Sequence, residues 1–373
     1  MDKRLNVLDL FCGCGGFSLG FDMAGLNIMG AVDIWEDALH TYQRNFASVA
    51  ILQRDLSEAT PREVIQELGL DVNDIDVIIG GPPCQGFSLS GHRFMNDPRN
   101  KLYRAFVDMV DYVKPQAFVM ENVPGMLKLF GGRFRSEIIN GFSDIGYTLS
   151  YAILNAADYG VPQARRRVFI VGLSQENFRD SHYEFTFPPA SHGDGRIPYI
   201  TSKEAISDLP LLNDNLPGGE GVDYAMSPQN DYQKSMRDGS CLVYNHIATI
   251  HRPRTREIIA LVPDGGNYKD LPVELRDTRK VNIAWTRMNS NKPSFTIDTG
   301  HNHHFHYLAD RVPTVRESAR IQSFPDKFLF YGTKTSQLRQ VGNAVPPLLA
   351  RVLAEQILVQ ICANAKRIRD QVI

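Results

Sequence analysis

The sequence of 373 residues contains no apolar run long enough to cross a membrane. The nearest approach, close to the carboxyl end, is interrupted by Arg351 and Glu355. Only five cysteines are present, scattered and odd in number, which favours reduced thiols over a disulfide framework. Met1 to Arg4 lead directly into a strand pattern without a signal peptide. These absences predict a cytoplasmic protein that has no membrane partner.

The net charge is also small, at −2, but the charged residues are unevenly distributed along the sequence. Residues 1–100 carry 7 Lys and Arg against 14 Asp and Glu, whereas residues 251–340 carry 15 against 9. A basic segment of this kind can face phosphate groups, although solvated surfaces with a chance bias would give the same numbers. The charge pattern therefore permits a nucleic-acid partner for residues 251–340.

Two common ligand motifs are missing as well. The glycine-rich turn Cys12-Gly13-Cys14-Gly15-Gly16 is not followed by the Gly-Lys-Ser/Thr of a phosphate-binding P-loop. Four histidines have one- and two-residue spacings with no Cys or Glu close by, which is poor for a tetrahedral zinc site: His301, His303, His304 and His306. We predict polar contacts or packing for these histidines, and no bound metal.

What is present is organised around the stretch Gly80-Gly81-Pro82-Pro83-Cys84-Gln85-Gly86-Phe87-Ser88. The apolar run from Ile75 to Ile79 leads into it and predicts a buried strand. The glycines and prolines then end this strand in a rigid turn. Cys84 is thereby expected at the carboxyl end of a central strand, where open α/β sheets bind their ligands. A lone cysteine is more often a small buried hydrophobe, so a functional role for Cys84 depends on its partners.

The first 56 residues have the layout of a nucleotide-binding unit. The run 5–11 predicts a first strand, the glycine turn follows, and a helix begins at Phe17. A second strand, 28–32, ends at Asp33, which is placed to accept hydrogen bonds from a ribose diol, beside Ile34 and Trp35 as an adenine surface. Alternatively, Asp33 caps the helix predicted over 36–46. A third strand, 51–56, carries Asp55 near its end.

Further charged groups are predicted at strand ends. Glu121 follows the strand 117–120 and is itself followed by Asn122, Val123 and Pro124. The runs 147–155 and 168–173 predict the closing strands of the sheet. Between them stand three arginines, of which Arg165 and Arg167 would share one face of a strand and Arg166 the other. Two guanidinium groups on one face suit an anion or a polar base edge, whereas solvated edge charges are the alternative.

The composition and the periodicity of the sequence change from about Phe185. Turn-forming residues are dense through Gly221 and strand periodicity is poor until Trp285, which predicts a separate, irregular unit. Arg252, Arg254 and Arg256 form a basic cluster within it. Order returns with a helix predicted over 315–324, a turn over 340–346 and a last helix over 346–363.

A thiol, a carboxyl group and a guanidinium beside an adenosine-type pocket suit nucleophilic addition to a pyrimidine. The thiolate of Cys84 would attack carbon 6, and an acid would support the ring at N3 as charge develops. Carbon 5 would then become nucleophilic enough to accept a methyl group.

Six motifs in order resemble those of the cytosine-C5 DNA methyltransferases, of prokaryotic restriction–modification type. They are Asp9-Leu10-Phe11 with Gly13, Gly15 and Gly16; Pro82-Pro83-Cys84-Gln85; Glu121-Asn122-Val123; Gln163-x-Arg165-x-Arg167; Arg316-Glu317-x-x-Arg320-x-Gln322-x-Phe324-Pro325; and Gln340-Val341-Gly342-Asn343-Ala344-Val345. The resemblance covers the chain apart from about 185–296. One departure is Cys12, where the family usually has Ala or Ser; this thiol should fit but could be oxidised.

The resemblance implies a role for each matching residue. Cys84 is the nucleophile, Glu121 contacts N3 and the amino group of cytosine, and Arg165 and Arg167 support the flipped base. S-adenosylmethionine would be held by Phe11, Gly13, Gly15, Gly16, Asp33, Ile34, Asp55, Leu56, Pro82, Asn343 and Val345. DNA contacts are predicted at Ser88, Ser90, Arg93, Arg252 and Arg254.

The resemblance also implies an α/β fold, a Rossmann-like, doubly wound and mostly parallel sheet with one antiparallel strand near its edge. We predict a catalytic and S-adenosylmethionine-binding domain formed by 1–185 and 338–373. Residues 186–337 would form an inserted, smaller target-recognition domain and hinge. The expected partner is double-stranded DNA, methylated by a prokaryotic monomer that is paired in function with a restriction endonuclease without forming a stable complex.

Three other functions remain open at this point. A methyltransferase for exocyclic amino groups would need no nucleophile and typically carries Pro-Pro-Tyr rather than Pro-Pro-Cys. The tRNA relatives of the family share Cys84 and Glu121 but usually carry a Cys-Phe-Thr signature, which this chain lacks. An inactive DNA-binding regulator would be expected to lose Cys84, Glu121 or Arg165. The sequence does not specify which DNA sequence is recognised.

Overall fold

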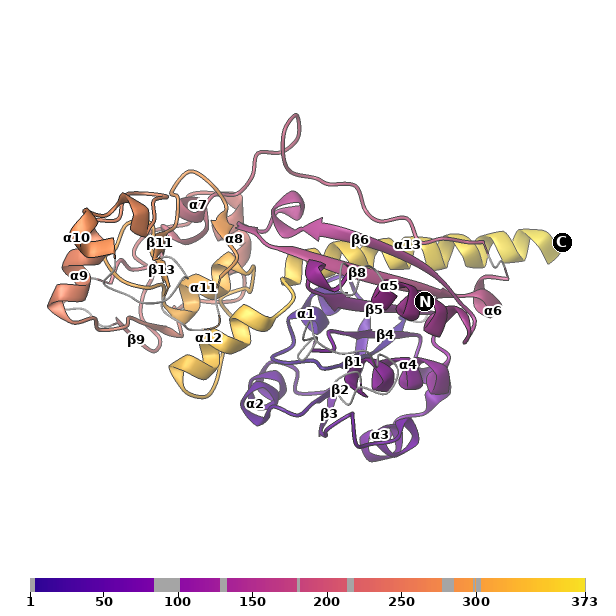
Figure 1. Ribbon diagram of the computed structural model, residues 1–373. Coiled ribbons are helices and arrows are strands. Elements are labelled where there is room, and N and C mark those ends of the chain that lie inside the picture. Colours follow the sequence, from indigo (N-terminus) through magenta and orange to yellow (C-terminus); the bar gives the residue numbers. More distant parts are fainter. Residues whose placement is uncertain are drawn as a thin grey trace. The chain divides into compact units, whose positions relative to one another are not determined.

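The computed structural model describes residues 4–83, 101–127, 133–179, 182–212, 218–276, 285–297, 299 and 303–372. The chain forms two compact units (Figure 1). Unit 1 comprises Met1–Asn155, Arg166–Pro189 and Pro347–Ile373, and unit 2 comprises Ala156–Arg165 and Ala190–Pro346. Residues 156–165 and 338–346 lie in unit 2, whereas the sequence predicts them in the catalytic domain. The functions predicted for the two domains stay predictions.

Unit 1 is built on a seven-stranded sheet in the order β3-β2-β1-β4-β5-β8-β6. Its first five strands are parallel, and β8 is antiparallel to both of its neighbours. This arrangement confirms the predicted mostly parallel, doubly wound sheet with one antiparallel strand near its edge. The strands are β1 (Asn6–Leu10), β2 (Asn27–Asp33), β3 (Ala50–Gln53), β4 (Val77–Gly80), β5 (Ala117–Asn122), β6 (Tyr147–Asn155) and β8 (Arg166–Ser174).

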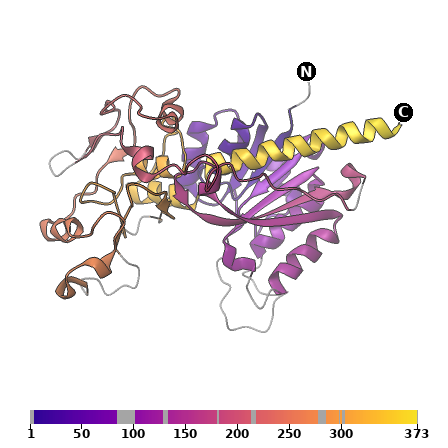
Figure 2. The same ribbon diagram turned by 90° about the horizontal axis from the view of Figure 1, so that it is seen from above.

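Helices cover both faces of this sheet (Figure 2). One layer contains α3 (Pro61–Leu68), α4 (Lys101–Val113) and α5 (Arg133–Ser143), whose apolar residues join those of the strands in one core. The other layer contains α1 (Gly16–Met23), α2 (Glu36–Asn45) and α13 (Pro347–Val372). Short pieces, η1 (Val72–Asp74) and α6 (Gln175–Phe178), complete the unit. Buried strands between two helical layers explain the near-continuous apolar runs of the sequence.

Local signals in the sequence account for the ends of α3. Thr60 accepts a hydrogen bond from the Glu63 amide, and the Glu63 carboxylate accepts one from the Thr60 amide at 2.8 Å, which forms a capping box. Pro61 occupies the first helical position, where its missing N–H is not needed. Gly69 ends the helix in the left-handed conformation, with φ of 68°.

The stretch Lys334–Asp370, which contains most of α13, is long and apolar enough to cross a membrane by length and composition alone. Its apolar side is nevertheless occupied, because Leu349, Leu353 and Ile357 are fully buried in the fold. It packs so closely on α1 that a Cβ added at Gly20 would lie 2.4 Å from the Ala350 Cβ. The apolar composition of α13 is therefore that of a core helix in unit 1.

Unit 2 consists of short elements joined by irregular segments, as the poor periodicity predicted. Its strands occur in two-stranded pieces, and none of its described helices exceeds 10 residues. The elements are η4 (Ala156–Tyr159), β7 (Gln163–Ala164), α7 (Ser202–Ile206), β9 (Gly218–Gly219), α8 (Asp231–Arg237), β10 (His246–Ile247), α9 (Pro253–Ala260), η5 (Tyr268–Asp270), α10 (Val273–Arg276), β11 (Thr286–Arg287), β12 (Ser294–Phe295), β13 (His304–Phe305), α11 (Val315–Ile321) and α12 (Lys334–Asn343).

Buried ion pairs around α11 hold unit 2 together. Arg320 contacts both oxygens of Asp326 at 2.6 Å and Asp208 at 3.1 Å, and all three side chains are buried. Arg311 makes a bidentate pair with Glu317 at 2.7 and 2.8 Å. Burial alone would raise the pKa of Glu317, but the positive charge of Arg311 lowers it.

These ion pairs correct our interpretation of the basic segment. Four of the 15 Lys and Arg residues in 251–340 are buried and paired with carboxylates, so they do not face phosphates: Arg287, Arg311, Arg316 and Arg320. Any positive charges of this segment that contact DNA phosphates must therefore belong to its other Lys and Arg residues. Charge counts could not reveal this, because a sequence does not show which charges are buried.

The predicted turn over 340–346 is also wrong in part. Gln340 to Asn343 form the last turn of α12, and Ala344 is its C-cap. Gly342 and Asn343 suggested a turn, but both residue types are tolerated near the end of a helix. The helical backbone becomes extended at Ala344.

Candidate active site

The strand β4 ends where the sheet reverses its winding direction, between β1 and β4. Gly80 pairs with Leu10, and a Cβ at Gly80 would lie 2.3 Å from the Leu10 carbonyl oxygen, so only glycine fits there. The backbone continues through Gly81 to Pro82, whose carbonyl accepts a hydrogen bond from the Asn122 side chain at 2.9 Å. The segment entering Cys84 is thereby fastened to the end of β5.

Glu121, a predicted catalytic residue, stands on β5 opposite Phe169 of β8. Its Oε1 lies 2.9 Å from the Nε of Arg167, another predicted catalytic residue, which comes from β8. The two side chains are 12% and 17% exposed, so this ion pair is largely shielded from water. The other oxygen, Oε2, lies beside Gly81, where an added Cβ would be 3.3 Å away. The ion pair therefore aims one carboxylate oxygen towards the segment that leads to Cys84.

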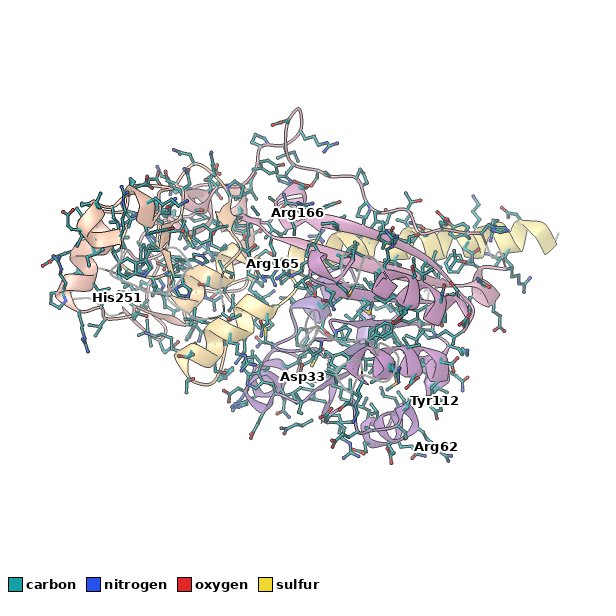
Figure 3. All side chains as sticks on the ribbon, in the orientation of Figure 1. Asp33, Arg62, Tyr112, Arg165, Arg166 and His251 are labelled. Atoms are coloured by element: carbon teal, nitrogen blue, oxygen red, sulfur yellow. The ribbon has the colours of Figure 1, made fainter. Side chains whose placement is uncertain are left out.

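Arg165 belongs to unit 2, in the segment that precedes β8. Its side chain is buried, whereas the neighbouring Arg166 is exposed and Arg167 is intermediate (both Arg165 and Arg166 are labelled in Figure 3). Its backbone is fixed on both sides, because its N–H donates to the Gln163 carbonyl and its own carbonyl accepts from the Ala156 amide, each at 2.9 Å. Arg165 lies between β7 and β8 and not on a strand, so a face shared with Arg167 stays a prediction.

Some of the predicted site residues lie outside the described residues. They are the nucleophile Cys84 and three predicted DNA contacts, Ser88, Ser90 and Arg93. His301 lies outside them too, whereas His306 is buried and accepts hydrogen bonds from the Leu308 and Ala309 amides at 3.0 and 2.9 Å.

The glycine turn after β1 has an unusual backbone. Phe11, Gly13 and Gly15 all have positive φ, of 59°, 53° and 95°. A positive φ is rare in an aromatic residue because it strains the backbone. Residues strained in this way cluster at binding sites, where the surrounding structure holds them in place. Around Gly13 an added Cβ would meet nothing within 4 Å, so there is open space on this side of the turn. The predicted cofactor residue Gly16 then begins α1.

Asp33 holds this turn in place. It is the last residue of β2, and its carboxylate accepts from the Gly13 amide at 2.8 Å and from the Trp35 amide at 2.9 Å (Figure 3). Helix α2 begins after Trp35 and has no side-chain cap, so Asp33 does not cap it. Burial raises the pKa of Asp33, and the hydrogen bonds from Trp35 and Gly13 oppose that shift.

A buried polar chain beneath the turn was missed in the sequence. Tyr42 donates to the Ser18 hydroxyl, which donates to Asp9, with both oxygen–oxygen distances at 2.6 Å. Burial raises the pKa of Asp9 to about 8, so this carboxyl group is mostly protonated at neutral pH. Its signal in the sequence was an acidic residue in the middle of an apolar strand.

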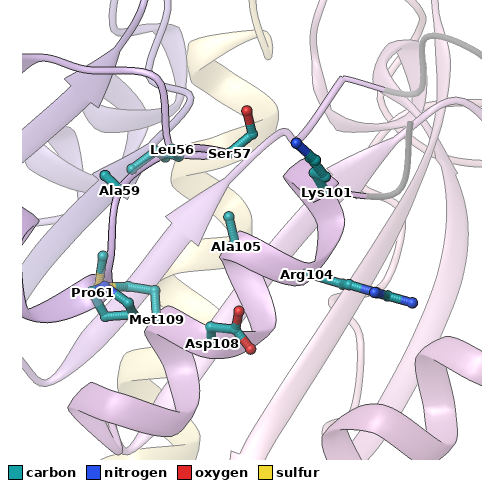
Figure 4. Close-up of a pocket in the computed structure, with 9 residues that line it drawn as sticks. All are labelled: Leu56, Ser57, Ala59, Pro61, Lys101, Arg104, Ala105, Asp108 and Met109. Carbon is teal, nitrogen blue, oxygen red and sulfur yellow. The ribbon is translucent and has the colours of Figure 1, made fainter. Parts of the chain in front are cut away.

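Two further predicted cofactor residues of unit 1, Asp55 and Leu56, follow β3, and Ile34 follows β2. The Asp55 side chain accepts from the Ser57 amide at 2.8 Å, Leu56 is buried and Ile34 is 61% exposed. Leu56 lines a pocket of about 210 Å³, whose other walls come from the start of α3 and from α4 (Figure 4). The charged residues that line this pocket are Lys101, Arg104 and Asp108.

Cys12 and Cys14 are both buried in the glycine turn. Burial raises the pKa of the Cys14 thiol to about 12 and that of Cys12 well above its usual range, and Asp33 adds to the shift for both. Because the thiolate is the form that reacts with oxidants, burial protects Cys12 from oxidation. The oxidation that its position suggested is therefore not expected.

Four predicted binding residues belong to unit 2. Asn343, the last residue of α12, is exposed, and Val345 is buried. Arg252 and Arg254 are exposed at the start of α9, where Arg254 pairs with Glu257 at 3.2 Å.

Comparison with known proteins identifies the family. The model of the C-5 cytosine-specific DNA methylases matches residues 5–359. The chain is 42% identical to the type II methyltransferase M.DdeI of Desulfomicrobium norvegicum, over 95% of this chain and 88% of that protein. It is 40% identical to the type II methyltransferase M1.HphI of Haemophilus parahaemolyticus, over 95% and 87% of the two chains.

Solved structures share the fold of this chain. A candidate DNA modification methyltransferase encoded within a prophage (E. coli) has a TM-score of 0.76 and 29% identity, with 95% of this chain and 99% of that chain covered. Spodoptera frugiperda DNMT2, at 18% identity and a TM-score of 0.59, has the same fold over 96% and 99% of the two chains. The chain belongs to the family of C-5 cytosine-specific DNA methylases and is a DNA cytosine-5 methyltransferase.

Proposed function

We propose that this enzyme methylates carbon 5 of a cytosine flipped out of a specific double-stranded DNA sequence, through a covalent bond between Cys84 and carbon 6. The observation that carries the proposal is the geometry at the ends of β4 and β5. Asn122 fastens the segment that enters Cys84, and Arg167 aims the Glu121 carboxylate at the same segment. We therefore expect Cys84 and Glu121 to reach opposite sides of the same cytosine ring.

Each residue has a distinct task in this proposal. The Cys84 thiolate forms a bond to carbon 6, which makes carbon 5 nucleophilic. Glu121 supports N3 and the amino group of cytosine, and Arg167 keeps Glu121 in one orientation while the charge on the ring changes. Loss of the proton at carbon 5 then allows the bond between Cys84 and carbon 6 to break. Flipping the base out of the duplex costs a few kcal/mol, which contacts with DNA must offset.

S-adenosylmethionine is the cofactor that the family implies, and the residues of unit 1 fit it. The open space beside Gly13 and the positive φ of Phe11 and Gly15 allow a ligand to approach the backbone before α1. Ile34 offers an exposed apolar surface for an adenine ring. When bound, S-adenosylmethionine supplies the methyl group that carbon 5 accepts. The residues proposed to hold it in unit 1 are Phe11, Gly13, Gly15, Gly16, Asp33, Ile34, Asp55, Leu56 and Pro82, and in unit 2 Asn343 and Val345.

Asp33 provides a test of this cofactor site. Asp33→Ala should weaken binding of S-adenosylhomocysteine, measured by calorimetry, by about tenfold or more, because two charge-assisted hydrogen bonds that hold the turn are lost. Asp71→Ala is the matched control, since Asp71 also accepts from a backbone amide two residues on but is exposed. Equal affinities for the wild-type enzyme and Asp33→Ala would remove Asp33 from the site.

We further propose that unit 2 reads the DNA sequence and that Arg252 and Arg254 contact its phosphates. Their support is exposure at the surface of α9, in contrast to the buried arginines of α11. The similarity to type II methyltransferases supports a role in protecting cytoplasmic DNA of a prokaryotic host from a partner endonuclease. We propose that the enzyme acts as a monomer.

The product identifies the reaction. Double-stranded DNA of varied sequence, incubated with the enzyme and S-adenosylmethionine, should yield 5-methylcytosine in nucleoside mass spectrometry, and bisulfite sequencing should locate it within one short sequence. Methylation at N4 of cytosine or N6 of adenine would contradict the carbon 5 chemistry. Efficient methylation of tRNA but not of DNA would contradict the substrate.

A further inference from the structure

Two buried glutamine side chains in unit 2 join segments that are far apart in the sequence. The Ile297 amide donates to Oε1 of Gln163 at 3.1 Å, and Nε2 of Gln163 donates to Oε1 of Gln322. Nε2 of Gln322 then donates to the carbonyl oxygen of Ala344 at 2.5 Å. Both glutamine side chains are fully buried. The result is one continuous chain of hydrogen bonds, the glutamine relay, made of Ile297, Gln163, Gln322 and Ala344.

The backbone groups at the two ends fix the direction of the relay. Ile297 can only donate through its amide, so it requires the oxygen of Gln163. The Ala344 carbonyl can only accept, so it requires the NH₂ group of Gln322. Each amide then has one orientation, and reversing either would leave a buried polar group unsatisfied. The relay is therefore a specific link and not a loose polar contact.

The first end of the relay is attached to the Arg165 segment. Gln163 lies on β7, which pairs with β12, and its carbonyl accepts from the Arg165 amide at 2.9 Å. A displacement of the Gln163 side chain would therefore move the backbone that carries Arg165.

The second end is attached to the Asn343–Val345 segment. Ala344 is the C-cap of α12, and its amide donates to the Gln340 carbonyl at 3.2 Å. Gln322 itself is held at the end of α11, where its amide donates to the Ser318 carbonyl at 2.9 Å. The relay thus connects two segments through one anchored side chain.

We propose that Gln322 is a positioning residue that couples the cofactor segment to the arginine segment. This inference rests on the proposed function, in which Asn343 and Val345 hold the cofactor, and on the role that the family resemblance implies for Arg165, support of the flipped cytosine. Ordering of 343–345 by the bound cofactor fixes the Ala344 carbonyl, which fixes Gln322, Gln163 and the backbone at Arg165. Cofactor binding and placement of Arg165 are then favourable together.

The test compares three variants at a temperature at which all are folded. Gln322→Met removes both hydrogen bonds of Gln322 while keeping the length of the side chain. It should weaken S-adenosylhomocysteine binding and slow single-turnover methyl transfer, each by about tenfold, because a buried hydrogen bond and its orphaned partner are lost. Gln163→Met breaks the relay from the other end and should change both quantities in the same direction. The double variant should be no worse than the poorer single variant, because both break one chain.

Gln233→Met is the matched control. Gln233 is another fully buried glutamine of unit 2, whose side chain donates to the Glu204 carbonyl at 2.8 Å and accepts from the Gln229 amide at 2.7 Å. It should lower thermal stability as much as Gln322→Met but leave cofactor affinity and methyl transfer within twofold of wild type. Equal effects of Gln322→Met and Gln233→Met, or additive effects in the double variant, would overturn the proposal.

The outcomes separate the relay from the proposed function. If the wild-type enzyme methylates DNA and Gln322→Met matches it, the relay fails alone. If the wild-type chain does not methylate cytosine, the proposed function fails, and the calorimetric comparison of cofactor affinity still decides the relay. Should Gln322→Met not fold, Gln163→Met decides it through the same two measurements.

Discussion

Target DNA that contains 5-fluorocytosine is expected to trap this enzyme in a covalent complex, and Cys84→Ala is expected to abolish the trap. The reason lies in the order of bonds: Cys84 bonds to carbon 6, carbon 5 accepts the methyl group, and the enzyme is released only when carbon 5 loses its proton. Fluorine cannot leave as a cation, so the reaction stops with the protein attached to the base. The complex should survive denaturing gel electrophoresis and require S-adenosylmethionine.

The other cysteines provide the controls for this experiment. Cys241 and Cys362 are exposed thiols, so they test whether accessibility alone produces trapping. Cys12 and Cys14 are buried and their raised pKa values disfavour the thiolate. Alanine at any of these four positions should leave trapping intact.

Glu121→Gln should slow formation of the complex by about 100-fold without preventing it, since the group that supports N3 is weakened while the nucleophile stays. Persistent trapping in Cys84→Ala would show that the nucleophile is misassigned.

The sheet and the strand-end position of the candidate site could be predicted because their signals are local. Apolar runs such as Ile75–Ile79 identify buried strands, and the residues that follow them must lie at the carboxyl ends of the strands. Glu121 lies within β5, one residue before its end, and Asp33 ends β2, as this reasoning requires. The capping box of α3 is likewise encoded in four consecutive residues.

What could not be predicted depends on contacts between distant residues. Gln163 and Gln322 are 159 positions apart, and nothing in either neighbourhood indicates that their side chains meet. The sequence leaves Asp33 to bind a ribose or to cap a helix; the structure shows no cap at α2 but hydrogen bonds from the Gly13 and Trp35 amides, and ribose binding stays a prediction. Its partners are set by the tertiary fold, because strand β2 brings Asp33 beside a turn that is 20 residues away.

The buried arginines of α11 lead to the largest expected effect on stability. Arg320→Met should lower the free energy of unfolding of unit 2 by about 3–5 kcal/mol, because the buried Asp326 and Asp208 would lose their closest partner and keep only longer contacts, with Arg316 at 3.7 Å and Arg237 at 3.5 Å. Arg254→Met is the control in the same unit: Arg254 pairs with Glu257 at 3.2 Å, but both side chains are largely exposed. Removing such a surface pair should change the free energy of unfolding by about 0.5 kcal/mol or less.

Only two tryptophans are present, one in each unit, which allows unit 2 to be followed by itself. In a Trp35→Phe background, the fluorescence of Trp285 reports urea unfolding of unit 2, where its ring packs on Phe305 at 5.5 Å. A loss of less than about 1 kcal/mol in Arg320→Met would show that the ion pair contributes no more than a surface pair.

The dependence of folding stability on pH provides a second test of the same ion pairs. Burial alone would raise the pKa of Asp326, but hydrogen bonds from Arg320 and its charge lower it below the ordinary value. In the wild-type enzyme, the stabilisation from Asp326 is therefore present above the pKa of an unfolded aspartate and is lost as the pH falls through the lower, folded value. In Arg320→Met the largest lowering influence is gone, whereas the Arg316 charge and the Tyr224 hydrogen bond remain. The pKa of Asp326 should therefore rise, so acidification from neutral pH towards 5 should cost the variant less stability than it costs the wild-type enzyme. Adding Asp326→Asn to Arg320→Met should remove this dependence on pH, because the carboxyl group that titrates is then absent.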